Sequence, residues 1–284
     1  MSDPCDPPEG EVEAPTTGRG ATLAAIVDQA VTLVIAISIA LAIRHFVVEP
    51  FRIPSGSMFP TLLIGDHLFV NKLAYGATVP FSELRLPGFS EPKRGDVVVF
   101  EVARPLNKIG GRDIKPVDLV PEGTPTEDFV KRLVGLPGDR IAWRDGRIFV
   151  NDVALEVGPT DQQFVDDSGR SFAMSWEDLG NCRHSILSDA TSHGRRESRL
   201  DRGSWVVEPG RYFMMGDNRD NSNDSRVWGT VRFQELKGPA VILYWSWNVN
   251  GNMLSFFNPM NWFRAEKRWE RIFQRIRCES KPEV

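Results

Sequence analysis

Ser57 lies in a short turn of small and hydroxyl-bearing residues, Pro-Ser-Gly-Ser-Met-Phe-Pro-Thr-Leu, over residues 54–62. A glycine between two serines lets the backbone approach a substrate closely. A serine hydroxyl in such a turn can act as a nucleophile when a base lies beside it. Because Pro-Ser-Gly-Ser is also ordinary turn chemistry, this segment alone does not identify a catalytic site.

The sequence offers two kinds of base for this serine. No histidine lies in a tight, glycine-bounded motif, which argues against a Ser-His-Asp triad; the four are His45, His67, His184 and His193. Lys131 is the alternative, because burial can hold a lysine neutral. It lies in an apolar segment predicted as a strand, with Arg132 directly after it. Adjacent strand side chains point to opposite faces, so we expect one of these two cations to face inward. A solvated edge lysine is the competing interpretation.

A third block is dense in polar side chains. All ten residues from 217 to 226 are Asp, Asn, Arg or Ser, and they lie between an apolar segment and a glycine. A surface turn does not require this density, whereas a buried polar network does, because each buried charge needs a partner. A calcium loop is the alternative, but the bidentate Glu that completes such a loop is absent. The block therefore predicts a scaffold network rather than a metal site.

These blocks follow a long apolar segment near the start of the chain. Residues 1–20 are rich in Pro, Glu, Gly and Thr and predict a disordered tail. Residues 21–48 predict a transmembrane anchor, because about 23 helical residues span roughly 35 Å and a bilayer core is about 30 Å thick. A cleaved signal sequence is the rival. The acidic tail before the segment, and Arg-His-Phe in place of a small-x-small cleavage site after it, favour the anchor. Basic residues do not settle its orientation.

The remainder of the chain predicts a mainly β domain over residues 49–258. Short apolar runs at 96–100, 212–215 and 241–245 indicate strands, and Asp-Gly between 141–144 and 147–150 indicates a hairpin. Polar insertions are expected near 104–127 and 181–203. Residues 259–284 predict a basic amphipathic helix that either rests on an anionic membrane surface or caps the β domain.

Composition excludes some classes of function. The net charge of −4 argues against nucleic acid as a partner, because phosphate binding needs a concentrated basic face. The three cysteines are scattered without a C-x-x-C pair, so neither a zinc site nor a dithiol redox site is predicted. Cys182 and Cys278 either pair in an oxidising compartment or remain free thiols.

Taken together, the blocks resemble those of the bacterial type I signal peptidases, which are Ser-Lys serine proteases. Four motifs occur in the family's order: Ser-Gly-Ser-Met-x-Pro-Thr-Leu at 55–62, Gly-Asp-x-x-x-Val-Asn-Lys at 65–72, Lys-Arg-x-x-Gly-x-Pro-Gly-Asp at 131–139, and Gly-Asp-Asn-Arg-Asp-Asn-Ser-x-Asp-Ser-Arg at 216–226. The resemblance covers about 51–72, 96–100, 129–150 and 211–229. The chain departs from the best-known members in having one anchor rather than two, and in its polar insertions.

The resemblance implies a role for each matched residue. Ser57 is then the nucleophile and Lys131 its general base, and Ser222 orients the lysine amine. The Ser57 backbone N–H and the Ser55 hydroxyl are similar to the family's oxyanion hole. The remaining positions resemble structural salt bridges and the pocket for small substrate side chains; these are Arg132 with Asp217, Asp224 with Arg226, and Ile53 with Val130.

The resemblance also implies what the protein does. It predicts a membrane-bound endopeptidase that cleaves signal peptides from exported preproteins after small residues, through an acyl-enzyme and without a metal or organic cofactor. It predicts a single-pass protein of the bacterial cytoplasmic membrane, in contact with lipid, with the catalytic domain on the periplasmic side. The alternatives are a cytosolic self-cleaving Ser-Lys repressor, which the anchor opposes, and a tethered binding module with a degenerate site, which the intact serines and lysine oppose.

Overall fold

The computed structural model describes residues 19–79, 82, 84–103, 115–144, 146–166, 169–180, 182–188, 203–248 and 266–278. The chain forms two compact units, Met1–Ile43 and Arg44–Val284. Almost all of the predicted tail, and much of both predicted insertions, lie outside the described residues.

The first unit contains one long helix, α1 (Arg19–Ala42), which a π-helical turn, η1 (Ile43–Val47), continues into the second unit. The 24 residues of α1 correspond to a helix length of roughly 36 Å. Residues Ala24–Val47 are long and apolar enough to cross a membrane, with a mean hydropathy of 2.3. The apolar side chains of α1 from Ile26 to Leu41 are exposed on every side of the helix, as in a helix made for apolar surroundings. This agrees in length and composition with the predicted anchor.

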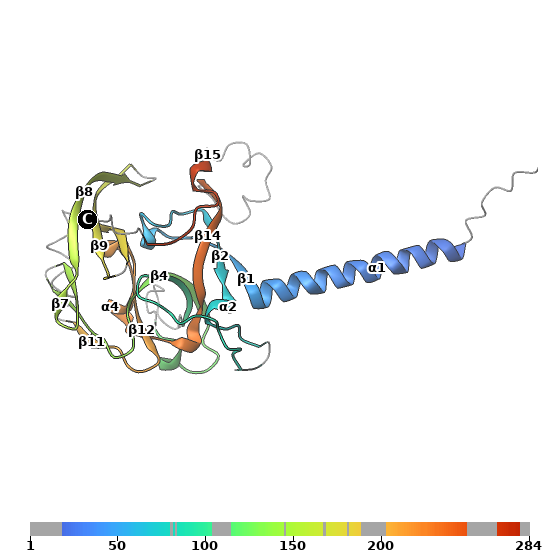
Figure 1. Ribbon diagram of the computed structural model, residues 1–284, viewed down its shortest axis with the longest axis horizontal. Coiled ribbons are helices and arrows are strands. Elements are labelled where there is room, and N and C mark those ends of the chain that lie inside the picture. The colour runs from blue at the N-terminus through green and yellow to red at the C-terminus, as the bar shows by residue number, and fades with distance from the viewer. Residues whose placement is uncertain are drawn as a thin grey trace, which may run out of the picture. The chain divides into compact units, whose positions relative to one another are not determined.

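The second unit is built mainly from antiparallel β-sheets, as predicted (Figure 1). The largest sheet has the strand order β1-β2-β14-β3-β4-β12-β13, with β15 also paired to β14. Its strands are β1 (Val48–Arg52), β2 (Asp66–Asn71), β3 (Val97–Ala103), β4 (Thr126–Gly135), β12 (Arg211–Met215), β13 (Val231–Arg232), β14 (Leu236–Asn248) and β15 (Glu266–Lys267).

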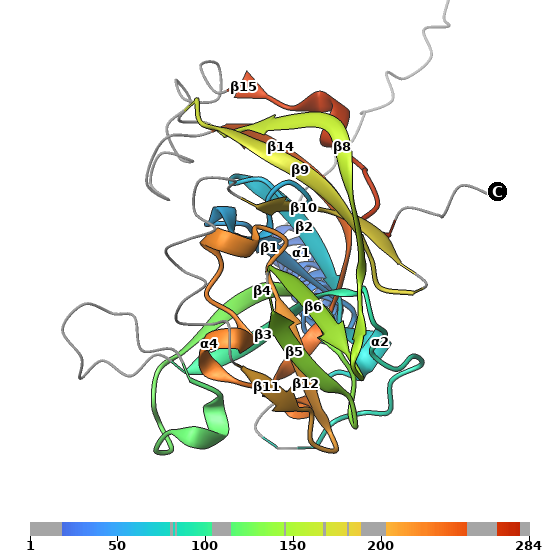
Figure 2. The same ribbon diagram turned by 90° about the vertical axis from the view of Figure 1, so that its left-hand side faces the viewer.

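Two smaller sheets complete this unit. One has the order β11-β5-β6-β7 and contains the predicted hairpin; its strands are β5 (Arg140–Arg144), β6 (Arg147–Val150), β7 (Val153–Ala154) and β11 (Ser204–Val206). The other has the order β10-β9-β8, with a long β8–β9 hairpin (Figure 2); its strands are β8 (Glu156–Val165), β9 (Ser171–Asp178) and β10 (Arg183–Ser188).

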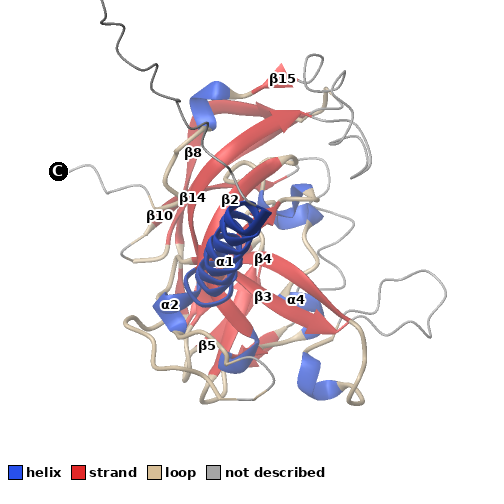
Figure 3. Ribbon diagram, turned by 90° about the vertical axis from the view of Figure 1, so that its right-hand side faces the viewer, coloured by secondary structure: helices blue, strands red, loops and turns tan. Residues whose placement is uncertain are grey.

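Helical turns connect the strands of the second unit, and none of those described is longer than four residues (Figure 3). The α-helical turns are α2 (Lys72–Tyr75) and α4 (Ser225–Trp228). The 3-10 turns are η2 (Gly56–Met58), η3 (Val117–Leu119), η4 (Arg219–Asn221), η5 (Phe233–Glu235) and η7 (Trp269–Arg271).

The central sheet is buried on both faces. Along β3, Val97 and Val99 belong to one apolar cluster, whereas Val98 and Phe100 belong to another. Alternate strand residues point to opposite faces, so a strand with apolar clusters on both sides reads as a continuous apolar run. The neighbouring strand β4 pairs with β3 from Thr126 to Arg132, and its residues Val130 and Leu133 belong to the same two clusters.

Two predictions about peripheral segments need correction. Within the predicted insertion at 181–203, Arg183–Ser188 is a strand, β10. The predicted C-terminal helix over residues 259–284 is wrong for the described residues 266–278, which we call the C-terminal strap. The strap runs as a short strand, a 3-10 turn and extended backbone along β14.

Backbone hydrogen bonds explain why the strap is not helical. Phe273 N donates to Leu243 O at 2.7 Å, and Ile276 N donates to Val241 O at 3.0 Å. The helical periodicity counted Phe273 as an apolar-face residue, yet 73% of its surface is exposed. Pairing with β14 therefore overrides the local 3.6-residue pattern. A disulfide between Cys182 and Cys278 fixes the end of the strap and decides between the two open alternatives for these cysteines.

Candidate active site

The turn that carries Ser57 follows β1 and begins the 3-10 turn η2. Met58, one residue further on, is 1% exposed and anchors this turn in the apolar core. Asn218, from the third block, donates from its backbone N to Ser57 O at 3.1 Å. Its side-chain amide donates to Gly56 O at 3.0 Å. The polar block thus holds the backbone on both sides of the Ser57 side chain.

Lys131 lies in the middle of β4 and points its amine at Ser57. The distance from Lys131 Nζ to Ser57 Oγ is 2.6 Å, and Nζ also donates to the backbone carbonyl of Val130 at 3.1 Å. Only 1% of the Lys131 side chain is exposed, whereas Ser57 is partly exposed. A buried base therefore contacts a hydroxyl that a substrate can reach.

The surroundings of Lys131 favour its neutral form. Burial lowers the pKa of Lys131 to about 8, because a charged amine loses its hydration there. The carboxylates of Asp224 and Asp217 oppose this change, and the Arg226 guanidinium adds to it. A substantial fraction of the amine is thus unprotonated within about one pH unit of neutrality, and the neutral amine can accept a proton from a serine hydroxyl.

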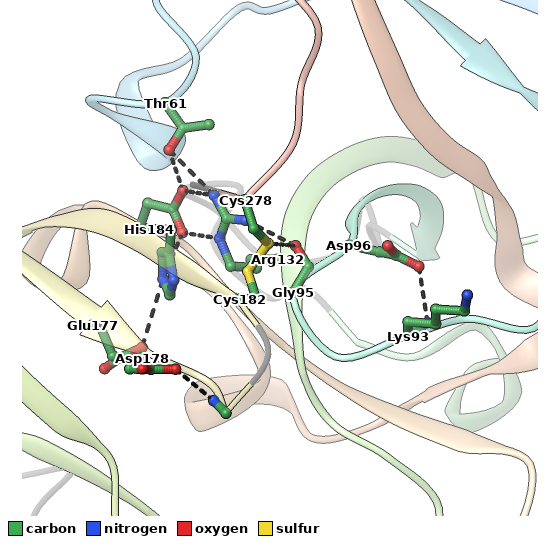
Figure 4. Close-up of a disulfide and its surroundings, with 12 residues drawn as sticks. Thr61, Lys93, Gly95, Asp96, Arg132, Glu177, Asp178, Cys182, His184 and Cys278 are labelled. Carbon is green, nitrogen blue, oxygen red and sulfur yellow. Dashed lines mark hydrogen bonds and ion pairs between the residues drawn. A yellow bond between two sulfur atoms is a disulfide. The ribbon is translucent and has the colours of Figure 1, made fainter. Parts of the chain in front are cut away.

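Arg132 is buried as well, so both adjacent cations face inward rather than one. The central sheet is covered on both faces, and each cation finds a partner on its own side. Arg132 donates from Nε to Asp217 Oδ1 at 2.8 Å and from Nη2 to Asp217 Oδ2 at 2.7 Å. Its third nitrogen, Nη1, donates to Gly95 O at 2.8 Å. The hydroxyl of Thr61 donates to Asp217 Oδ2 at 2.6 Å (Figure 4).

The second predicted ion pair joins Asp224 to Arg226. Arg226 donates from Nε and Nη2 to the two carboxylate oxygens, each at 2.9 Å. Asp224 also accepts from Gly216 N at 3.0 Å. Burial alone would raise the pKa of Asp217 and Asp224, but the paired arginines outweigh it and lower the pKa of both carboxyl groups. The block is therefore a buried network that holds arginines, as the scaffold interpretation predicts.

No side chain of the remaining predicted site residues is hydrogen-bonded to the lysine amine. Ser222 is 7% exposed, and its hydroxyl lies close enough to Asp224 to help lower the pKa of that carboxyl group. Ser55 is exposed, and its hydroxyl makes no capping bond to η2. Ile53 and Val130 pack in one apolar cluster, consistent with a common pocket. The structure thus brings Ser57 and Lys131 into contact, and leaves Ser55 and Ser222 beside them.

Sequence reasoning missed a further buried layer behind Asp217. Arg219 forms two hydrogen bonds to the carboxylate of Glu177, at 2.6 and 2.5 Å. His184 Nε2 lies 3.6 Å from Glu177 Oε2 and 3.6 Å from Asp217 Oδ1 (Figure 4). Burial, with the charges of nearby arginines, lowers the pKa of His184 well below its usual value, so the ring is neutral. Residues 183–188, Arg-His-Ser-Ile-Leu-Ser, do not alternate between polar and apolar side chains, so no clear sequence signal marked this layer.

A mainly β unit that holds a buried lysine against a serine hydroxyl defines a scaffold for a serine hydrolase. Residues 26–245 match the family described as signal peptidase, peptidase S26. Signal peptidase I of Pseudomonas fluorescens is 37% identical over 222 residues, covering 74% of this chain and 69% of that protein. The signal peptidase I of Rickettsia typhi is 32% identical over 261 residues, covering 84% and 90%. The chain belongs to the signal peptidase I family of serine endopeptidases.

A solved signal peptidase I from Enterococcus faecalis is also similar, with 22% identity, coverage of 53% of this chain and 97% of that chain, and a TM-score of 0.28. The match of the family over most of the chain confirms the resemblance that the four motifs predict.

Proposed function

We propose that this protein removes signal peptides from secreted preproteins, with Ser57 as the nucleophile and Lys131 as the general base. The observation that carries the proposal is the 2.6 Å contact between a buried lysine amine and a partly exposed serine hydroxyl. A lysine with a pKa of about 8 supplies a base near neutral pH. Membership of the signal peptidase I family supplies the substrate class.

The reaction follows from this contact. Neutral Lys131 accepts the proton of the Ser57 hydroxyl while Oγ attacks the carbonyl carbon of the scissile peptide bond. The protonated amine then gives its proton to the departing amine nitrogen, which leaves an ester between Ser57 and the signal peptide. Lys131 next takes a proton from a water molecule that attacks this ester, and Ser57 regains its proton when the ester breaks.

Charge develops on the carbonyl oxygen during each attack. The backbone N–H of Ser57 and the hydroxyl of Ser55 are the proposed donors to that oxygen. Ser55 is exposed, and its hydroxyl is not committed to a cap bond. Ile53 and Val130 are proposed to line the pocket that selects small side chains, because both lie in the apolar cluster that also contains Met58 of the nucleophile turn.

The same proposal includes the location of the protein in the cell. An apolar helix of membrane-spanning length, directly before the β unit, supports a single-pass anchor. We place the protein in the bacterial cytoplasmic membrane with the β unit on the periplasmic side. The disulfide between Cys182 and Cys278 supports an oxidising compartment for this unit.

The decisive experiment compares the purified protein with its Ser57→Ala variant on a preprotein substrate. Wild type is expected to release a mature protein whose new N-terminus follows a small residue. The variant is expected to show no cleavage, with a melting temperature close to that of wild type, because the Ser57 hydroxyl contributes little to packing. Cleavage at the wild-type rate by the variant would overturn the assignment of the nucleophile.

A further inference from the structure

A cleft with a volume of about 1000 Å³ lies between β10, the C-terminal strap and the segment that follows the nucleophile turn. Thr61 and Arg132 line one side of it, and both contact Asp217. Thr61 is four residues from Ser57, which limits the separation along the chain to roughly 14 Å. The cleft is therefore distinct from the Ser57–Lys131 contact but close to it.

The lining of this cleft is strongly basic. Five arginines and one histidine contribute to it, and none of its described lining residues is Asp or Glu; the basic residues are Arg132, Arg183, His184, Arg271, Arg275 and Arg277. This is unusual for a chain with a net charge of −4. Such a concentration of one sign attracts and holds the opposite charge.

Three of these arginines have no carboxylate partner among the described residues. Arg132 is paired with Asp217, and Arg271 is paired with Asp66 at 2.6 Å. Arg183, Arg275 and Arg277 form no such ion pair within the described part of the chain. The guanidinium of Arg183 lies 4.1 Å from the ring centre of Trp176, which fixes its position without neutralising its charge.

Strand geometry directs two of these charges away from the core. Ile276 packs against the apolar cluster that also contains Leu243. Side chains alternate along an extended chain, so Arg275 and Arg277 point away from the face that Ile276 buries. They lie roughly 7 Å apart along the strap, and Arg271 lies further along it. The charges are thus spread along the cleft rather than gathered at one point.

A neutral histidine also belongs to the lining of the cleft. His184 lines the cleft and is 3% exposed, and its Nδ1 has no hydrogen-bond partner in the described structure. A buried ring nitrogen without a partner costs free energy. His184 therefore adds a polar, uncharged side chain to the lining of the cleft.

We propose that this cleft binds an acidic segment of an extended polypeptide, and that the segment belongs to the exported protein being cleaved at Ser57. The spread of Arg183, Arg275 and Arg277 fits several carboxylates in sequence better than one compact ion. A carboxylate can also accept two parallel hydrogen bonds from the guanidinium group of each of these arginines. The assignment of the segment to the substrate rests on the proposed function, whereas the binding itself does not.

The binding experiment uses the full chain in detergent with Ser57→Ala, so that no peptide is cleaved. The probe is a fluorescent peptide with six glutamates, compared with the same peptide carrying six glutamines. Fluorescence anisotropy is expected to show at least roughly tenfold tighter binding of the glutamate peptide at low salt, and a smaller difference as salt rises.

Matched variants distinguish binding in this cleft from nonspecific attraction to positive charge elsewhere on the protein. Arg275→Glu with Arg277→Glu is expected to remove the preference for the glutamate peptide. Arg144→Glu with Arg147→Glu changes the net charge equally on the exposed β5–β6 hairpin and is expected to retain the preference within about twofold. Arg275→Gln with Arg277→Gln, checked for an unchanged melting temperature, guards against a folding defect.

Three results would overturn the proposal. The first is equal binding of both peptides. The second is full displacement of the glutamate peptide by millimolar inorganic phosphate, which would indicate a site for a compact oxyanion. The third is that replacing Arg275 and Arg277 weakens binding to vesicles of anionic phospholipid but leaves binding to the acidic peptide unchanged. This result would indicate a site for a lipid headgroup.

A cleavage experiment then tests the link to the substrate. Two preprotein peptides differ only by glutamates or glutamines within about ten residues of the scissile bond. Wild type is expected to have a lower KM for the acidic peptide, and the Arg275→Glu, Arg277→Glu variant is expected to lose this difference while kcat stays the same. An unchanged KM difference in the variant would overturn the link to the substrate. If wild type cleaves neither peptide, the proposed function is contradicted. The binding experiment would still show whether the cleft binds an acidic peptide.

Discussion

Arg132 holds the carboxylate of Asp217 through two hydrogen bonds, of 2.8 and 2.7 Å, one residue along β4 from the lysine that contacts Ser57. Both partners are almost fully buried, at 2% and 0% exposure of their side chains. The backbone that follows Asp217 bonds in turn to the Ser57 turn through Asn218. This ion pair therefore fixes β4, the polar block and the nucleophile turn relative to one another.

The first prediction concerns that ion pair. Asp217→Asn leaves Arg132 buried with a neutral partner and is expected to destabilise the β unit by about 3–5 kcal/mol. Asp152→Asn, which removes the partner of Arg140 from a pair exposed on both sides, is expected to cost less than about 1 kcal/mol. Denaturant unfolding of the two variants measures the difference, and similar costs for both would contradict the structural role.

The lowered pKa of Asp217 also predicts how the stability of the β unit changes with pH. A carboxyl group whose pKa is lower in the folded state contributes stability that is fully present above its unfolded pKa. This contribution is lost as the pH falls through the folded pKa. The stability difference between wild type and Asp217→Asn is thus expected to shrink in acid, which unfolding measured from about pH 6 down to pH 3 can test.

The second prediction concerns Lys131 as a base. With a pKa of about 8 in the folded protein, activity is expected to rise with pH as one proton leaves, with a midpoint near that value, before other groups titrate. Lys131→Met keeps a long apolar side chain and is expected to remove this activity. The measurement is turnover from about pH 6 to 10. An active Lys131→Met enzyme would end the Ser-Lys mechanism and return attention to Lys72 and the histidines.

The stability of Lys131→Met has an unusual expected sign. A buried lysine with a lowered pKa destabilises the folded state most fully where both states are protonated, which is below about pH 8. The cost then diminishes as the pH rises from the folded pKa toward the unfolded value near 10.4. The shift corresponds to about 3 kcal/mol, so Lys131→Met is expected to be neutral or stabilising at pH 7, and less so at pH 10. A large destabilisation at pH 7 would contradict the burial argument.

The third prediction concerns Ser222. If it orients the Lys131 amine during turnover, Ser222→Ala is expected to lower kcat by roughly 10- to 1,000-fold without abolishing acylation, because orienting a base contributes less than the base itself. Single-turnover kinetics with a preprotein separate acylation from later steps. The two residues are not hydrogen-bonded in this structure. Wild-type kcat in the variant would therefore leave Ser222 as a packing residue.

The fourth prediction concerns the disulfide. Cys182 and Cys278 are 96 residues apart in sequence, so the bond closes a long loop. Replacing both by serine is expected to lower the free energy of unfolding by about 2–4 kcal/mol. Cys5→Ser is the matched control, because it removes the third cysteine without touching this bond. Unfolding with and without a reducing agent should distinguish the variants, and an insensitive wild type would show that the bond does not contribute.

The motifs and hydropathy predicted the family, the mainly β unit and the pairing of Ser57 with Lys131 from sequence alone. The contact between Ser57 and Lys131 was predictable because each residue lies in a dense local motif, and motifs are written in consecutive residues. The long apolar helix α1 was predictable from its hydropathy, and the strands β3, β5, β6, β12 and β14 were predictable from apolar runs that reflect burial at short range. These properties do not require knowledge of which distant segments meet.

Contacts between segments that lie far apart in the sequence decided the other features of the fold and the site. Whether one or both of Lys131 and Arg132 face inward depends on apolar cover over both sides of β4, which segments distant in sequence supply. The strap has a helical pattern, yet it follows β14 because the strand offers it backbone hydrogen bonds that no local pattern records. The same pairing brings Cys278 to Cys182 and sets the strap's arginines opposite Arg183, which is why the basic cleft is visible only in three dimensions.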